Sequence, residues 1–173
     1  SFRCVALESI QHDERCACFV IRKLPSQIFS WNELRLSHSM LCEILYGKDE
    51  YGTVEGKLVN RGGIIFVIGE TDSGKSTTLN ALIYEIATRQ SWLFMTFEDP
   101  VETLLPNNYE SGARIIQRDI VSSELVEGLK TALRANADVV KVGEIRDKNS
   151  ARLAVDASLA GHTVMVTIHA SSI

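Results

Sequence analysis

The sequence has no long apolar run and almost no excess charge, and each absence excludes a class of protein. Its apolar runs, such as Ile64–Ile68, are only as long as a strand, whereas a membrane-spanning helix needs about 20 apolar residues. The net charge of −4 over 173 residues predicts no basic surface, so we expect no direct binding of nucleic acid. The first residues lack the pattern of a signal peptide, so the expected location is cytoplasmic.

Cysteine is scarce as well, and the four cysteines all lie in the first quarter of the chain: Cys4, Cys16, Cys18 and Cys42. Cys16 and Cys18 alternate, so a strand would place both on one face, which is compatible with half of a metal site. The sequence offers no second close pair of Cys or His to complete such a site. We therefore favour small buried thiols in a reducing compartment.

The amino-terminal third predicts two strands followed by a helix. Residues 4–8 and 16–21 are typical of strands around a polar turn, and Pro25 ends that pattern. A helix is expected over residues 30–46, where apolar residues recur at helical spacing. Residues 47–63 are polar and contain glycine, which predicts a loop with at most one short strand. Because the chain starts without methionine and stops just after a strand-like run, we expect it to be part of a longer protein.

From Ile64 onward, strands and helices alternate. Strands are expected over residues 64–68, 92–97, 114–117, 138–142 and 164–168. Apolar stripes predict two helices between them, at Leu79, Leu82, Ile83 and Ile86 and at Leu125, Leu129, Ala132 and Leu133. A further helix is expected over residues 149–159. Ser122 or Ser123 is expected to cap the second of these helices. Ile64–Ile68 is uniformly apolar, so we expect it to be buried on both faces. The alternation predicts an α/β protein with a mostly parallel sheet covered on both faces.

Polar residues follow four of these strands. They are the glycine loop after Ile68, then Glu98 with Asp99, Gly143 with Glu144, and His169. Ligands of parallel sheets bind beyond the carboxyl ends of the strands. We therefore expect the active site at this edge of the sheet.

The loop GETDSGKS, residues 69–76, fits the pattern G-x-x-x-x-G-K-[ST] of a phosphate-binding P-loop and lies between an expected strand and an expected helix. Gly69 and Gly74 let the backbone wrap closely, so that amide N–H groups can face phosphate oxygens. The helix N-terminus adds positive potential. In such a loop Lys75 reaches the β- and γ-phosphates and Ser76 binds Mg²⁺, so the expected ligands are ATP and Mg²⁺.

The segment FEDPVE, residues 97–102, places Glu98 and Asp99 at the end of a strand. Three interpretations stay open here: coordination of Mg²⁺, activation of the attacking water, or an ordinary acidic turn shaped by Pro100.

The segment DVVKVGEIRD, residues 138–147, places Glu144 at the tip of an apolar strand. In P-loop ATPases a carboxylate at this position orients or deprotonates the attacking water. Arg146 is either a phosphate contact or a salt-bridge partner of Asp147 and Glu144, and a solvated charged turn is the less specific interpretation.

Two histidines bracket the last strand. His169 is expected at the active edge and His162 at the opposite end. Either can be a structural histidine held by a hydrogen bond, and for a lone histidine we favour that interpretation.

Taken together, four segments resemble the ATPase family of type II secretion, type IV secretion and type IV pili. GETDSGKSTTL resembles its P-loop, TFEDPVE its Asp box, DVVKVGEIRD its atypical Walker B segment and AGHTVMVTIHAS its His box. QRD, residues 117–119, and the helix that ends in Leu133 and Arg134 fit the family as well.

The resemblance implies a RecA-like P-loop core, preceded by the end of an N-terminal α+β domain. It places the end of that domain at residues 1–24, a linker and leading helix at 25–60, and the ATPase core, without its C-terminal part, at 61–173. Arginines that reach the nucleotide come from the N-terminal domain in this family, and Arg15 and Arg22 are the candidates here.

The family also implies roles for individual residues. Catalytic roles fall to Glu144, Lys75 and Glu98, and Mg²⁺ contacts to Ser76 and Asp99. The nucleotide contacts are expected from Gly69, Glu70, Thr71, Asp72, Ser73, Gly74, Lys75, Ser76, Thr77 and His169, the last as a sensor of the γ-phosphate.

The function implied is an ATP-hydrolysing motor subunit for pilus assembly, pilus retraction or protein export. The implied assembly is a homo-hexamer at the cytoplasmic face of the inner membrane, attached through platform or secretion-complex proteins. The alternative is a nucleotide-binding assembly or regulatory subunit with little or no hydrolysis. A small-molecule kinase shares the P-loop but does not account for the other three segments.

Three segments depart from the family pattern. Glu70 and Asp72 stand where the loop usually has Pro and Gly, which predicts weaker nucleotide binding rather than its loss. Lys141 replaces an aliphatic residue in a strand, so its side chain must snorkel, pair with an acid, or face an open part of the sheet. Asn136 and Ala137 replace an Asp-Pro pair.

Overall fold

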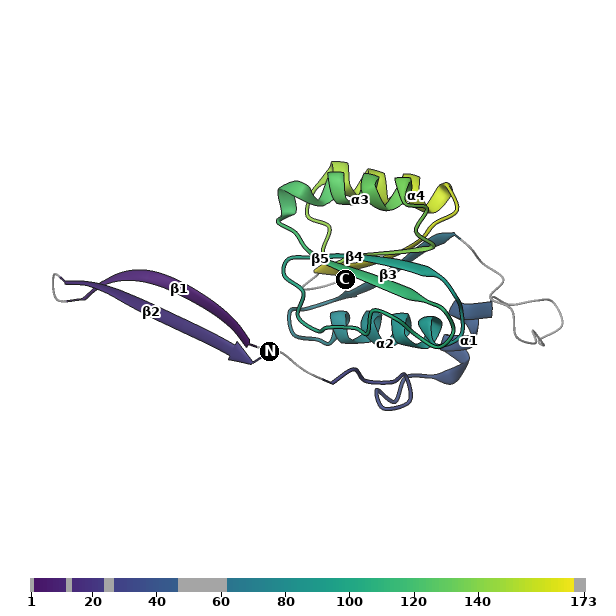
Figure 1. Cartoon of the computed structure of the whole chain (residues 1–173), viewed down its shortest axis with the longest axis horizontal. Coiled ribbons are helices and arrows are strands. Elements are labelled where there is room, and N and C mark those ends of the chain that lie inside the picture. Colours follow the sequence, from purple (N-terminus) through teal and green to yellow (C-terminus); the bar gives the residue numbers. More distant parts are fainter. Residues whose placement is uncertain (1, 12–13, 24–26, 47–61, 170–173) are drawn as a thin grey trace.

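The computed structural model describes residues 2–11, 14–23, 27–46 and 62–169, with side chains for 27–44 and 62–169. The first two strands form an antiparallel hairpin. β1 (Phe2–Gln11) pairs with β2 (Glu14–Lys23) along its whole length. Figure 1 shows this hairpin beside the α/β layers rather than within them. The two expected strands are confirmed and are longer than predicted. The predictions for Cys4, Cys16, Cys18, Arg15 and Arg22 concern side chains outside the described residues.

The remaining strands form one parallel sheet of five, in the order β3–β7–β6–β4–β5. These strands are β3 (Gly63–Gly69), β4 (Leu93–Glu98), β5 (Arg114–Asp119), β6 (Val139–Val142) and β7 (Thr163–His169). All the strand-to-strand pairings are parallel, so every carboxyl end lies at the same edge. The predicted α/β fold with a mostly parallel sheet is confirmed.

Helices cover both faces of the sheet (Figure 1). On one face lie α1 (His38–Tyr46) and α2 (Lys75–Ala87), and on the other lie α3 (Leu125–Arg134) and α4 (Lys148–Leu159). A short 3₁₀ turn, η1 (Ser122–Glu124), leads into α3. Two apolar clusters fill the spaces between the layers. Trp31, Leu79, Ile83 and Phe94 belong to the cluster beside α2, and Phe97, Leu129, Val140 and Ala157 to the cluster beside α3 and α4.

The central strands are buried on both sides because helices pack on both faces. All four residues of β6 are buried, as are five of the six residues of β4. Gly128 of α3 lies so close to β4 that a Cβ atom there would come within 2.9 Å of the Phe97 ring. Helix α3 therefore packs directly against β4, the strand that ends at Glu98.

The prediction that Ile64–Ile68 is buried on both faces is wrong. β3 is the outermost strand on its side among the described strands, and Phe66 and Ile68 are 45% and 48% exposed. Ile65 and Val67 pack against the cluster beside α2. The sequence run is apolar throughout, but the described residues cover the face of Ile65 and Val67 only in part and leave Phe66 and Ile68 exposed.

The helix expected over residues 30–46 is also shorter than predicted. α1 begins only at His38, and Arg35 has a positive φ of 54°, which an α-helix does not tolerate. Trp31 lies in the irregular segment before it, 1% exposed, with its ring N–H donating to the Ser37 carbonyl. Burial of this indole therefore fixes a non-helical path where periodicity alone predicts a helix.

The predicted serine cap of α3 is wrong as well. Among the described residues no side chain caps α3 or the 3₁₀ turn before it, and the Ser122 hydroxyl donates instead to a carboxylate oxygen of Asp99. By contrast, α4 has an N-cap that the sequence patterns did not reveal. Asp147 accepts hydrogen bonds from the backbone N–H groups of Asn149 and Ser150.

Candidate active site

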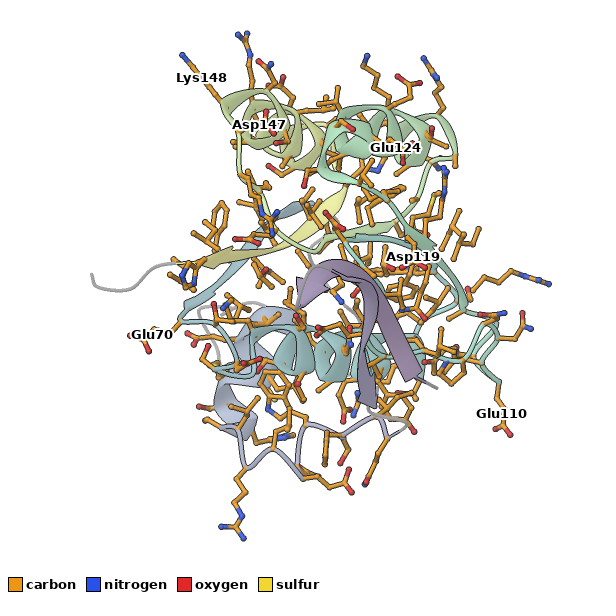
Figure 2. The ribbon with its side chains drawn as sticks, turned by 90° about the vertical axis from the view of Figure 1, so that its left-hand side faces the viewer. Glu70, Glu110, Asp119, Glu124, Asp147 and Lys148 are labelled. Atoms are coloured by element: carbon orange, nitrogen blue, oxygen red, sulfur yellow. The ribbon has the colours of Figure 1, made fainter. Side chains whose placement is uncertain are left out.

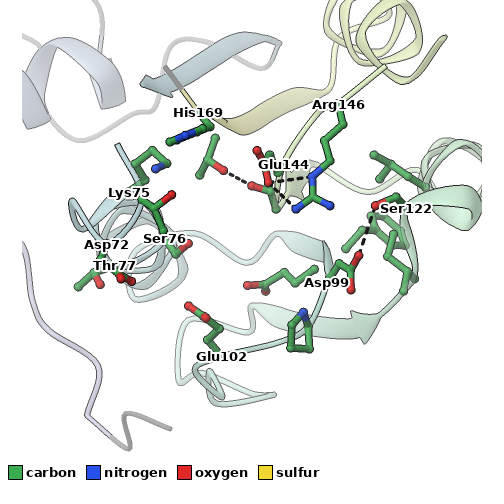
Figure 3. A pocket seen from close by; sticks show the side chains of 18 of the residues that line it. Asp72, Lys75, Ser76, Thr77, Asp99, Glu102, Ser122, Glu144, Arg146 and His169 are labelled. Carbon is green, nitrogen blue, oxygen red and sulfur yellow. Dashed lines mark hydrogen bonds and ion pairs between the residues drawn. The ribbon is translucent and has the colours of Figure 1, made fainter. Parts of the chain in front are cut away.

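A pocket of about 550 Å³ lies at the carboxyl edge of the sheet, where the predicted polar segments converge (Figure 3). Lys75, Ser76 and Thr77 enter it from the start of α2, and Asp99 from the end of β4. The other predicted residues that line it are Thr71, Asp72, Gly74, Glu98, Glu144 and His169. Gly69, Glu70 and Ser73 are not among its lining residues. The structure therefore brings together ten of the predicted site residues around one cavity.

The P-loop joins β3 to α2 with a geometry suited to an anion. Gly74 precedes α2 with a φ of 89°, and no side chain in the described part of the chain caps this helix end. The first N–H groups of a helix have no partner within the helix, so a phosphate can accept from them. A Cβ atom on Gly69 would come within 2.8 Å of the Ser73 hydroxyl, so a larger residue there would require the Ser73 side chain to move. The Lys75 ammonium donates to the carbonyls of Gly69 and Glu70, which holds it over the loop.

The two acidic residues of the loop differ in placement. Asp72 lines the pocket and has a φ of 59°, so the conformation that usually requires glycine is present here. Glu70 is exposed, and Figure 2 shows its side chain pointing outward from the molecule. Asp72 is therefore the acidic residue that a bound polyphosphate would meet.

The Glu144 carboxylate is paired with the Arg146 guanidinium inside the pocket (Figure 3). The Arg146 Nη2 and Nε atoms lie 2.7 and 3.0 Å from Glu144 Oε2. This hydrogen bond and the charge of Glu144 raise the pKa of Arg146 above its usual value. Both bonds use Oε2, so Oε1 takes no part in the pair. Of the two partners that the sequence suggested for Arg146, the structure gives Glu144, while Asp147 caps α4.

The strand end that carries Glu144 is held close to β4. The Gly143 N–H donates to the Phe97 carbonyl over 2.8 Å, and the Thr167 hydroxyl donates to the Gly143 carbonyl. A Cβ atom on Gly143 would approach the backbone of Glu98 to 3.2 Å. The glycine therefore allows the two carboxylate-bearing strand ends to lie side by side.

Glu98 lines the same pocket, but its side chain is almost buried and the residue is only 4% exposed. Its Oε2 atom lies 2.7 Å from the ammonium of Lys141, which is fully buried. Of the three environments that the sequence allowed for Lys141, the structure shows pairing with an acid.

The two histidines lie at opposite ends of β7, as predicted. His169 is exposed at the edge of the pocket. His162 precedes β7, and its Nδ1 atom lies 2.7 Å from the Ala137 carbonyl oxygen. The structural interpretation is therefore confirmed for His162.

The oxygen atoms around the pocket suit a hard cation that is also coordinated by phosphate oxygens. Hydroxyl and carboxylate oxygens are the ligands that Mg²⁺ prefers, and Ser76, Asp99, Glu102 and Glu144 supply them. Within residues 27–44 and 62–169, no three His, Cys, Asp or Glu side chains converge on a metal position. The pocket therefore fits a Mg²⁺ ion held by few protein ligands together with phosphate oxygens, which is its usual mode in phosphoryl-transfer sites.

Sequence patterns missed several residues of the site. Glu102 and Ser122 line the pocket, and Asn80 lies behind it in contact with Lys141. No local signal marks Ser122 or Asn80 as part of the site, because each reaches it only through the fold of the chain. The one available hint is Glu102, which closes the acidic segment that begins at Glu98.

The described helices include none that is long and apolar enough to cross a membrane.

Comparison with known proteins gives one family match and several sequence relatives. Residues 6–173 match the family described as Type II/IV secretion system protein. The chain is 42% identical to Type II secretion system protein E of Klebsiella pneumoniae over 119 residues, which is 69% of this chain and 23% of that protein. It is 39% identical to competence protein ComGA of Halalkalibacterium halodurans over 110 residues, which is 64% of this chain and 30% of that protein.

Solved structures resemble the chain over nearly its whole length. The Legionella pneumophila ATPase DotB has a TM-score of 0.82 with 25% identity, covering 99% of this chain and 44% of DotB. The pilus retraction motor PilT with bound ADP has a TM-score of 0.77 with 27% identity, covering 98% of this chain and 48% of PilT.

The chain spans less than half the length of these relatives. The α/β core is RecA-like, as in these secretion and pilus ATPases. With the family match over residues 6–173, the P-loop, the paired carboxylate strand ends and the pocket between them lead to one conclusion: the chain belongs to the type II/IV secretion system protein family.

Proposed function

We propose that this chain is the nucleotide-binding part of an ATP-hydrolysing motor subunit that powers type IV pilus assembly or retraction, or type II or type IV secretion. The observation that carries the proposal is the pocket in which the P-loop faces the carboxylates of Asp99 and Glu144. The relatives support it, because they include a pilus retraction motor and a secretion-system ATPase.

The P-loop would bind the polyphosphate of ATP. The uncapped N–H groups at the start of α2 and the ammonium of Lys75 supply the donors. Lys75 would exchange its contacts with the loop carbonyls for phosphate oxygens, and His169 stands at the pocket edge as the sensor of the γ-phosphate. Thr71 and Thr77 line the pocket and complete the set of nearby polar side chains.

Ser76 and Asp99 would hold Mg²⁺, which when bound neutralises phosphate charge. The Ser122 hydroxyl donates to Asp99 Oδ2 over 3.3 Å and so restricts the orientation of that carboxylate. Among the described residues no three His, Cys, Asp or Glu side chains converge on one metal position, which agrees with an ion that binds together with the nucleotide.

Glu144 would orient the attacking water and accept its proton. A carboxylate at a strand tip beside the phosphates is well placed for general-base catalysis. The Arg146 guanidinium holds Oε2 and fixes the carboxylate, while Oε1 is the oxygen outside that pair. Glu98 would support this arrangement from beneath the pocket. Closure of the site around ATP and its relaxation after hydrolysis would produce movement between domains.

The wider setting is also a proposal. We infer a homo-hexamer at the cytoplasmic face of the inner membrane, attached through platform or secretion-complex proteins. Residues 1–24 would end the N-terminal domain, residues 25–60 would link it to the core, and residues 61–173 would begin the ATPase core.

One observation favours a second candidate function, a nucleotide-dependent assembly subunit with little hydrolysis. Asp72 places a carboxylate in the loop that receives the phosphates, in a backbone conformation that usually requires glycine. Repulsion there would weaken binding of ATP and so impair its turnover.

The deciding experiment measures steady-state ATP hydrolysis by the full-length protein and by its Glu144→Gln variant, with the oligomeric state recorded in the same samples. Turnover that disappears in the variant while ATP still binds would support the motor with Glu144 as its catalytic carboxylate. Absence of turnover in both proteins, despite assembly and ATP binding, would favour the assembly subunit.

A further inference from the structure

Lys141 places a charged group in the apolar centre of the molecule. It lies in β6 with 0% exposure, and its neighbours in register are Thr96 of β4 and Met165 of β7. A buried ammonium is unfavourable unless it is paired and hydrogen-bonded. Lys141 meets both conditions, because its Nζ atom lies 2.7 Å from Asn80 Oδ1 and 2.7 Å from Glu98 Oε2.

The partner carboxylate is held on its other oxygen as well. Glu98 Oε1 accepts from the Thr96 hydroxyl over 2.9 Å and from the Gln117 amide over 3.4 Å. The same amide group of Gln117 donates to the Thr103 carbonyl. Both oxygens of Glu98 are therefore fixed by donors from three strands, and the side chain is 4% exposed.

This network joins the elements that build the pocket. Asn80 belongs to α2, the helix that begins at Lys75. β4 runs on into Asp99, and β6, which carries Lys141, runs on into Gly143 and Glu144. One ammonium thus connects the P-loop helix to both carboxylate-bearing strand ends.

The network also changes the charge beneath the pocket. The lining residues include five carboxylates, from Asp72, Glu98, Asp99, Glu102 and Glu144, against two cations, Lys75 and Arg146. A polyphosphate in this pocket meets a strongly acidic wall. The pairing of Glu98 with Lys141 removes one negative charge from that balance, at a depth where water screens it poorly.

From this geometry we propose that Lys141 is a positioning residue of the nucleotide site. It compensates the charge of Glu98 and fixes the P-loop helix relative to the ends of β4 and β6. The inference rests on the proposed function, since it concerns binding of nucleotide in the same pocket. The competing explanation is that Lys141 only stabilises the core.

The test is a double-mutant cycle in the full-length protein with Lys141→Met, Glu98→Gln and the double variant. Two quantities are measured for each: the midpoint of unfolding without nucleotide, and the dissociation constant for Mg²⁺ with a non-hydrolysable ATP analogue. Lys130→Met is the matched control, because Lys130 is a half-exposed lysine of α3 whose contact with Glu127 spans 3.6 Å.

We expect Lys141→Met to weaken binding about tenfold or more, because it leaves an uncompensated carboxylate beneath the phosphates. The double variant removes both charges, so it should bind the analogue more tightly and unfold later than Lys141→Met. If Lys141→Met cannot be purified, the double variant is compared with Glu98→Gln, which leaves the lysine buried without its acid and should be the less stable of the two. The control should match the wild type in both measurements.

Two results would overturn the inference while the proposed function stands. One is unchanged affinity in Lys141→Met despite an earlier unfolding midpoint, which would mean that Lys141 acts only in the core. The other is additivity of the two substitutions, in which the double variant binds the analogue more weakly and is less stable than either single variant. Wild-type protein that does not bind the analogue would instead refute the proposed function, and with it the role of Lys141 in binding.

Discussion

Asp72 shows at the scale of one residue how the P-loop of this chain departs from the usual pattern. Its φ of 59° lies in the left-handed region, where Asp is among the more tolerated residues other than glycine. A carboxylate about 6 Å from a phosphate repels it by roughly 0.7 kcal/mol per unit charge in a water-like dielectric. We therefore predict that Asp72→Gly tightens ATP binding about threefold.

Titration of the full-length protein with ATP measures this change. Glu70→Gln is the matched control, because it removes a charge of the same loop whose side chain points outward. Equal or weaker affinity in Asp72→Gly would contradict the prediction.

Tyr109 offers a second residue-scale prediction, far from the pocket. Its hydroxyl is buried without a hydrogen-bond partner among the described residues, and burial raises its pKa to about 12. The phenol of the unfolded chain ionises near pH 10, so the neutral form is favoured in the folded state. The stability that Tyr109 contributes is fully present below about pH 10 and is lost as pH rises from 10 towards 12.

Unfolding midpoints at pH 9 and pH 11 test this in wild type and Tyr109→Phe. The variant loses no hydrogen bond within the described residues, so we expect it to be at least as stable at pH 9. It should also lose less stability than the wild type at pH 11. An equal loss in both proteins would refute the raised pKa of Tyr109.

The sequence predicted most single residues of the pocket, because the glycine loop, Asp99, Glu144 and His169 each follow an apolar strand. It did not predict how their side chains pair. Lys141, Asn80 and Glu98 are separated by tens of positions in the chain, and only the packing of α2 against the sheet brings their polar atoms together. Pattern analysis restricted Lys141 to three environments but could not choose among them.

At the scale of elements, α4 depends on a cap at its first turn. Asp147 accepts from the backbone N–H groups of Asn149 and Ser150 and from the Ser150 hydroxyl. The Ser150 hydroxyl and N–H lower the pKa of Asp147 below its usual value. A lowered pKa means that the stabilisation is present above the pKa of the unfolded chain and disappears as pH falls through the pKa of the folded state.

We predict that Asp147→Ala lowers the unfolding midpoint at pH 7, while Asp147→Asn lowers it less because the amide retains an acceptor. The difference between wild type and Asp147→Ala should shrink as pH is lowered towards 3. A difference that is the same at pH 7 and pH 3 would mean that the charge of Asp147 does not stabilise the helix end.

Helices and strands with a strong local sequence pattern were predicted well. Those whose ends or burial depend on neighbouring elements were not. β4 and β6 follow from apolar runs, and α2 and α3 from apolar residues at helical spacing. The start of α1 depends on burial of Trp31, and the exposure of β3 depends on which strands and helices lie next to it. Periodicity reports which residues are apolar, but not which neighbours will cover them.

At the scale of the whole molecule, nucleotide should stabilise the fold, because the pocket is formed by several elements that separate on unfolding. We predict that Mg²⁺ and ATP at about 100 times the dissociation constant raise the free energy of unfolding by roughly 2.7 kcal/mol. Denaturant unfolding of the full-length protein with and without nucleotide measures this. Lys75→Ala is the control, since it removes the main phosphate cation and should show a much smaller increase. A wild-type unfolding midpoint that does not change when nucleotide is added would contradict the prediction.

The pairing of β3 with β7 has a consequence for how the protein is made. Gly63 lies opposite Thr163 and Gly69 opposite His169, so each β3 residue meets a neighbour 100 positions later in the chain. At a synthesis rate of about 5–20 residues per second, the ribosome needs roughly 5–20 seconds more to supply that neighbour. Until then the IIFVI segment lacks its partner strand. It is short, uncharged and rich in residues that favour strands, and exposed segments of this composition tend to aggregate. Production of this protein in cells should therefore depend on the chaperone capacity available during that interval.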